Sequence, residues 1–184
     1  MISELVDSNL IEEAYLWLCK QRKHFPVNSD VWDVRFHWNK VKPQLIDELL
    51  SNQFYFRPLQ KVTKSTGEII HLWTSIDSVV LKLLSLVLQR YLPCSKLCTH
   101  LKGHGGSKHT VTEIQRNFGG NTFVFRTDVK SYYESINHEI LLDKLSVYIK
   151  DKMVMNLLSQ YVKRSVESGG LLKDIKKAFH LVAR

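Results

Sequence analysis

The chain has 184 residues, of which 44% are hydrophobic and 24% are charged, and its formal net charge at pH 7 is +8. This composition excludes a disordered chain, and no apolar run approaches the roughly 20 residues that a membrane helix needs. No signal peptide is evident. Three cysteines argue against a disulfide framework, so we expect a cytoplasmic protein. The positive charge favours a polyanionic partner such as nucleic acid.

The first third of the chain has the apolar spacing of helices. This spacing predicts one helix over residues 9–20, with Asn9 and Glu12 placed as in a capping box. A second helix is expected from about Asp30. Pro43 favours the start of a third, because proline suits the first turn of a helix. Aromatic residues in these helices have the spacing of core packing rather than of a ligand cage.

A β-hairpin and a long helix are expected next. Residues 54–63 and 68–73 have the composition of two strands, and the four residues between them end in Gly67, where positive φ is easiest. From the residues alone, we expect the Lys64 side chain in this turn to be solvated at the tip of the hairpin. The apolar periodicity after residue 74 predicts a helix that Pro93 ends.

Positive charge is concentrated between residues 90 and 130. This segment has seven Lys and Arg residues and only two acidic residues, Glu113 and Asp128. Two interpretations remain open for the middle of this segment. One is a zinc site, suggested by the spacing of Cys94, Cys98, His100, His104 and His109. The other is a glycine-rich loop whose backbone amides face phosphate, with lysines alongside. A short helix is expected to follow over about residues 111–118.

Residues 122–127 form an apolar, β-branched and aromatic run that predicts one buried strand, and Asp128 follows directly. An Asp at a strand end is suited to a metal ion, although it often only caps a turn. Asn137 and Asp151 are expected to begin two further helices, and Gly169-Gly170 to form a turn.

The run around Asp128 reads Phe-Arg-Thr-Asp-Val-Lys-Ser-Tyr-Tyr-Glu-Ser-Ile and resembles the first catalytic motif of reverse transcriptases, particularly the group II intron and retron-like branch. Residues 54–92 resemble the fingers of that family, and residues 100–108 resemble its glycine-rich loop. The resemblance covers about residues 30–177. It implies an α+β fold, mostly helical with a small antiparallel sheet. The N-terminal helical region and fingers would span residues 1–118, and a partial palm would span residues 119–184.

The resemblance also implies roles for individual residues. Asp128 would be the catalytic carboxylate, and Asp128 with the Val129 carbonyl would hold Mg²⁺. The residues implied to bind the incoming deoxynucleoside triphosphate are Lys64, Ser131, Tyr132 and Tyr133, although Tyr132 could instead pack in the core. Those implied to bind the RNA template and primer duplex are Lys102, Gly103, Gly105, Gly106, Lys108 and Arg116. Many relatives carry arginine where this chain has Ile70, and the neighbouring His71 is a weaker replacement.

The sequence contains no Asp-Asp pair, and in this family such a pair supplies the other metal ligands within a Tyr-x-Asp-Asp motif. We therefore expect a chain that stops before that motif, by a frameshift or decay of the reading frame, and that does not polymerise alone. Two alternatives stay open. One is a non-catalytic RNA- or single-strand-binding module, and the other is a small zinc-dependent nucleic-acid-binding protein. Oligomeric state is not predicted.

Overall fold

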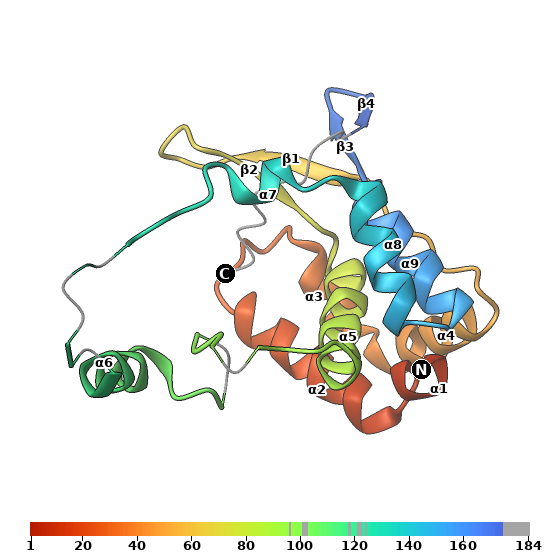
Figure 1. Cartoon of the computed structure of the whole chain (residues 1–184). Coiled ribbons are helices and arrows are strands. Elements are labelled where there is room, and N and C mark those ends of the chain that lie inside the picture. The colour runs from red at the N-terminus through yellow and green to blue at the C-terminus, as the bar shows by residue number, and fades with distance from the viewer. Residues whose placement is uncertain (96, 101–102, 118, 121–122, 124, 175–184) are drawn as a thin grey trace. The chain divides into compact units, whose positions relative to one another are not determined.

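The computed structural model describes residues 1–95, 97–100, 103–117, 119, 120, 123 and 125–174, apart from the side chains of Tyr133 and Glu134 (Figure 1). The chain forms two compact units: one comprises Met1–Tyr91 and the chain from Ser131 onward, and the other is Leu92–Lys130. The modules 1–118 and 119–184 were inferred from a family resemblance rather than from compactness, and they stay a prediction.

The larger unit begins with the helices α1 (Ile2–Leu5), α2 (Ser8–Gln21), α3 (Asp30–Phe36) and α4 (Trp38–Leu50). The predicted helix over residues 9–20 is confirmed as α2, but the predicted capping box is wrong. The cap is Asp7, whose carboxylate accepts hydrogen bonds from the amides of Asn9 and Leu10 at 3.0 Å. An Asp with extended backbone one residue before the helix reaches these two otherwise unpaired amides directly.

Pro43 lies inside α4 and does not start it, so the prediction for this helix start is wrong. A proline inside a helix removes one backbone hydrogen bond. Tertiary packing outweighs that loss here, because Trp38, Leu45 and Leu49 of α4 are buried on both sides of the proline in the sequence. Helical stability in proteins comes mostly from such a buried face.

Four strands form one sheet: β1 (Leu59–Thr63), β2 (Ile69–Leu72), β3 (Ser165–Ser168) and β4 (Leu171–Asp174). Their order is β2-β1-β3-β4. The predicted hairpin is confirmed as β1–β2, although its first strand begins at Leu59 and the prediction of strand over residues 54–58 is wrong. A second hairpin, β3–β4, is turned by Gly169 and Gly170, both with positive φ. The α+β class is confirmed. The sheet is mixed rather than purely antiparallel, because β1 and β3 pair in parallel with Leu59 opposite Val166.

The remaining helices of this unit are α5 (Ser75–Tyr91), α7 (Tyr132–Ser135), α8 (His138–Tyr148) and α9 (Lys152–Val162). The periodic helix predicted after residue 74 is confirmed as α5. The predicted caps of α8 and α9 are also confirmed. The Asn137 side chain accepts from two amides of α8 at 2.9 and 3.1 Å, and the Asp151 side chain accepts from two amides of α9 at 3.0 and 3.3 Å.

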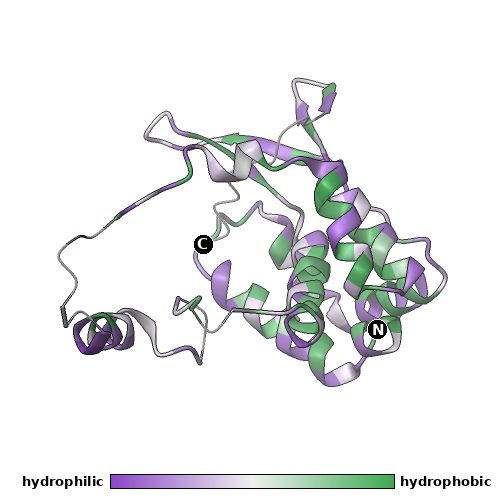
Figure 2. Cartoon of the chain, viewed as in Figure 1, coloured by the Kyte–Doolittle hydropathy of each residue, from purple (hydrophilic) through white to green (hydrophobic). Residues whose placement is uncertain are grey.

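The core of the larger unit lies where α2 packs against α5, and Figure 2 colours much of α5 as hydrophobic. Aliphatic side chains of α1, α2 and α5 are among the largest that this unit buries almost completely: Leu5, Ile11, Leu18, Val79, Val80, Leu83 and Val87. A wide apolar face on α5 therefore positions the helices around it. No helix in the described part of the chain has the length and apolar character to span a membrane.

Arg22, just after α2, links this core to the segment between β2 and α5. Its side chain is almost entirely buried, and it donates hydrogen bonds to the Trp73 carbonyl at 2.7 Å and to the hydroxyls of Ser75 and Ser78 at 2.8 Å. Asp30 lies 3.3 Å from the same guanidinium and accepts the Ser75 amide at 2.6 Å. Arg22 thus joins α2, α3 and α5 through satisfied polar contacts.

The smaller unit contains α6 (Gly106–Asn117), which buries none of its residues. The helix predicted over residues 111–118 therefore begins five residues earlier, and Phe118 lies outside the described residues. The predicted buried strand is wrong for the described residues 123 and 125–127, which form no strand, and Phe123 and Phe125 are 92% and 90% exposed. A strand needs a hydrogen-bonded neighbour, and the described part of this unit offers none.

Replacing Arg22 by Met should destabilise the chain by roughly 2–4 kcal/mol, because Asp30, Ser75 and Ser78 would lose a buried donor. Asp30 is half exposed, which keeps the loss below that of a fully buried pair. Urea unfolding measures the effect. The exposed neighbour provides the control, and Lys23→Met should change stability by less than about 0.5 kcal/mol. Equal effects of the two substitutions would contradict the structural role of Arg22.

Candidate nucleotide and nucleic-acid site

Asp128 is exposed in the smaller unit. One of its carboxylate oxygens accepts a hydrogen bond from the following Val129 amide at 3.0 Å, which is a local turn contact. Among the described residues, no three His, Cys, Asp or Glu side chains lie close enough together to hold a metal ion. Asp128 and the Val129 carbonyl therefore do not by themselves satisfy a two-ion magnesium site, which needs further carboxylates.

Ser131 and Tyr132 follow at the start of the larger unit's second segment. Ser131 adopts a left-handed backbone conformation, with φ 51° and ψ 43°, and forms the N-cap of α7. Such a conformation is uncommon for a residue other than glycine, and it marks a sharp turn shortly after Asp128. Tyr132 is 56% exposed, so the alternative that it packs in the core is wrong. Tyr133 belongs to α7, and its side chain lies outside the described part.

Lys64 lies at the tip of the β1–β2 hairpin, in the turn closed by Gly67 with φ 81°. Its ammonium forms an exposed ion pair with Glu68 at 2.7 Å. Exposed pairs of this kind contribute little free energy, so a stronger anion can displace Glu68. In β2, burial and the nearby Lys61 charge lower the pKa of His71, which keeps this imidazole neutral at pH 7. A neutral imidazole carries no charge to attract phosphate, so His71 is a weaker replacement for an arginine.

The glycines before α6 have the conformations that the loop requires. Gly103, Gly105 and Gly106 all have positive φ, and a Cβ on Gly105 would lie only 2.5 Å from the side chain of His109. The Gly106 amide already donates to the Thr99 carbonyl at 3.0 Å, which engages one of the amides expected to face phosphate.

Two cations of the predicted nucleic-acid site, Lys108 and Arg116, lie on α6 two turns apart, and both are exposed. Arg116 forms an ion pair with Glu113 at 2.9 Å. Figure 2 colours much of α6 as hydrophilic. Lys102 lies outside the described residues. The structure therefore places Lys108 and Arg116 on one unit with Asp128, while Lys64, Ser131 and Tyr132 belong to the other.

The zinc interpretation gains no support from the structure. Its candidate ligands Cys94, Cys98, His100, His104 and His109 are all within the described residues, and no three of them form a group that could hold a metal ion. The cysteines are free thiols. Spacing along the sequence therefore suggested a cluster that the fold does not assemble.

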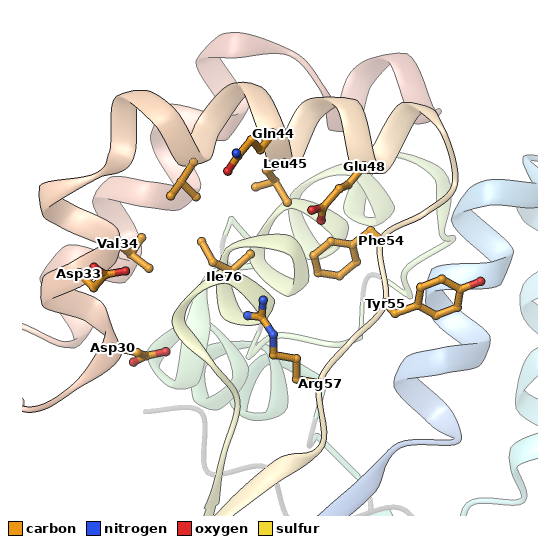
Figure 3. A pocket seen from close by; sticks show the side chains of 11 residues that line it. Asp30, Asp33, Val34, Gln44, Leu45, Glu48, Phe54, Tyr55, Arg57 and Ile76 are labelled. Carbon is orange, nitrogen blue, oxygen red and sulfur yellow. The ribbon is translucent and has the colours of Figure 1, made fainter.

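A pocket of about 290 Å³ in the larger unit was not predicted from the sequence (Figure 3). Its polar lining includes Asp30, Asp33, Glu48 and Arg57, and the Arg57 guanidinium reaches into it near Ile76. These residues come from α3, α4 and the segments before β1 and within α5, so no local motif could have revealed them. Asp30 already binds Arg22, and Asp33 contacts His37 at 2.9 Å. We assign both carboxylates to structure.

No protein-family model matches the chain. It is 25% identical over 129 residues to a Saccharomyces cerevisiae protein named for intron 1 of COX1/OXI3, a match that covers 65% of this chain. It is 28% identical over 140 residues, 73% of this chain, to an uncharacterized 91 kDa protein in the cob intron of Schizosaccharomyces pombe. It is 26% identical over 95 residues, 50% of this chain, to the uncharacterized mitochondrial protein ymf11 of Marchantia polymorpha. The chain is thus distantly similar to intron proteins.

The matches cover only 15%, 17% and 13% of these curated relatives. The chain therefore corresponds to a small part of each relative. The Marchantia relative is named as mitochondrial, so the names give the cytoplasmic expectation no support, and it stays a prediction.

Replacing Asp128 by Asn should change the free energy of unfolding by less than about 0.5 kcal/mol, because the side chain is exposed and, among the described residues, is bonded only to its neighbouring amide. Asn keeps an oxygen that can accept the same bond. Urea unfolding measures this, with Asp128→Ala as the variant that removes the acceptor. A loss above about 1 kcal/mol on Asp128→Asn would assign the carboxylate to the fold and remove it from the candidate site.

Proposed function

We propose that this chain is a nucleic-acid-binding part of an intron-encoded protein related to reverse transcriptases, and that Asp128 is its first catalytic carboxylate. The observation that carries the proposal is the exposed Asp128 within the motif Phe125–Ile136, in a unit rich in cations. The similarity to two intron proteins supports the same assignment. Enzyme activity, substrates and partners of a whole protein are part of this proposal.

The unit Leu92–Lys130 suits an RNA strand. It contains six Lys and Arg residues against Glu113 and Asp128, and Glu113 is already paired with Arg116. The described cations Lys108, Arg116, Arg126 and Lys130 are exposed. Cations that track phosphates release counterions, and exposed aromatic rings such as those of Phe123 and Phe125 can stack on bases. The proposed partners are an RNA template, its primer duplex and deoxynucleoside triphosphates.

For nucleotidyl transfer, Asp128 and the Val129 carbonyl would supply part of a magnesium site, and Mg²⁺ accepts few protein ligands beside its waters. One carboxylate does not hold two cations in register. The proposal therefore requires further carboxylates, and we expect no polymerase activity from the 184 residues alone. The runner-up function is a non-catalytic RNA- or single-strand-binding module. It is favoured by the finding that no three metal-ligating side chains lie together among the described residues.

Replacing Lys108 and Arg116 by Gln should weaken RNA binding and flatten its salt dependence. For a single strand, each phosphate that the protein no longer neutralises lowers the slope of log K against log salt by about 0.7. Fluorescence anisotropy with a labelled single-stranded RNA at several salt concentrations measures both effects. The matched control replaces Lys20 and Lys23 of the larger unit by Gln, which removes the same charge. An identical response of the two double variants would refute a binding role for α6.

Primer extension on an RNA template separates the two functions. The chain is joined to the remaining segment of an intron relative, and Asp128→Asn is compared with Asp143→Asn, an exposed Asp on α8. Loss of a metal ligand should lower extension by about 1,000-fold or more while RNA binding stays unchanged. If the joined protein is active and Asp128→Asn does not lower its extension, the non-catalytic binding module becomes the better explanation.

A further inference from the structure

Arg164 is a buried cation with no acidic partner in the described part of the chain. It lies between α9 and β3 and is only 6% exposed. One terminal nitrogen donates to the Tyr161 carbonyl at 3.0 Å, and the guanidinium lies over the Tyr161 ring at 5.2 Å. Its Nε is buried and has no acceptor among the described residues. Burying a charge without an opposite charge costs free energy, so binding an anion would stabilise the buried Arg164 guanidinium.

His138 supplies a second unsatisfied nitrogen nearby. It is the first residue of α8 and is only half-buried as a whole, but its Nε2 is buried and has no partner in the part of the chain that the structure describes. Helices α8 and α9 pack side by side and run in opposite directions (Figure 1), which brings the end of α9 to the start of α8. Burial and the Arg164 charge lower the pKa of His138, which keeps the imidazole neutral at pH 7.

We propose that Arg164 and His138 hold a phosphate group, and that its source is the backbone of the bound RNA. The proposal rests on the proposed RNA-binding function and adds a contact within the larger unit. The guanidinium fork matches phosphate oxygens, and a neutral imidazole protonated on Nε2 donates a further hydrogen bond. The amino end of α8 adds partial positive charge.

The negative charge of Glu139 has to be weighed against this assignment, and a water or a protein carboxylate is the alternative occupant. Glu139 lies in the first turn of α8, but it is exposed and therefore screened by solvent and salt. A buried water could also bridge the two nitrogens. A water-filled site would be insensitive to phosphate and to RNA, whereas a site for a protein carboxylate would respond to an acidic peptide in preference to phosphate.

The first test measures RNA affinity against salt for Arg164→Gln and His138→Gln. Each substitution should weaken binding by about 10-fold, and Arg164→Gln should lower the salt slope by about 0.7, the value for one phosphate that is no longer neutralised. Lys150→Gln is the control, because it removes one charge at the opposite end of the α8–α9 pair. Unchanged affinity and slope in both variants, with RNA binding intact, would overturn this site and leave the proposed function standing.

The second test needs no RNA. The imidazole signals of His138 in the full chain are followed by NMR while inorganic phosphate replaces chloride at constant ionic strength. Phosphate should shift them in the wild type and in Arg164→Lys, and not in Arg164→Gln. This response without any RNA binding would keep the phosphate site and refute the proposed function. No response, or a larger one to a poly-glutamate peptide, would overturn the phosphate assignment, and circular dichroism of each variant verifies folding.

Discussion

The larger unit depends on the contact of Arg22 with Asp30, Ser75, Ser78 and the Trp73 carbonyl. Trp73 follows β2 directly and Ser75 begins α5, so this one guanidinium holds the connection between β2 and α5 against the end of α2. Burial lowers the pKa of Arg22, and the charges of Asp30 and Asp77 counteract that effect. The apolar packing of α2 on α5 supplies the bulk of the stabilisation, while the arginine selects one arrangement of α2, α3 and α5.

The two buried arginines illustrate how the surroundings of a charge separate structure from recognition. Arg22 has three neutral acceptors and a carboxylate, which is what a cation needs to stay buried. Arg164 has one carbonyl, an aromatic ring and an unsatisfied Nε. The first arrangement is complete without a ligand and the second is not. This difference leads us to assign a phosphate to Arg164 and none to Arg22.

The features that suggest nucleic-acid chemistry are divided between two compact units. Asp128, Lys108 and Arg116 belong to the smaller unit, which buries no residue of its helix. Lys64, Ser131, Tyr132 and the Arg164–His138 pair belong to the larger unit, whose core is well packed. Under the proposed function, the larger unit would present the β1–β2 hairpin and the phosphate contact, and the exposed cationic helix would contact an RNA strand.

Local chemistry in the sequence was enough to predict the elements whose ends carry their own signals. Asn137 and Asp151 cap α8 and α9, Gly67 and Gly169-Gly170 turn the two hairpins, and the apolar periodicity of α5 gives its length. Tertiary packing alone set the parallel pairing of β1 with β3, the place of Pro43 inside α4, the pocket beside Arg57 and the packing that brings the end of α9 to the start of α8. These features join residues far apart in the chain or depend on burial. Caps and turns are set by neighbouring backbone groups, whereas long-range contacts are set by how whole elements pack.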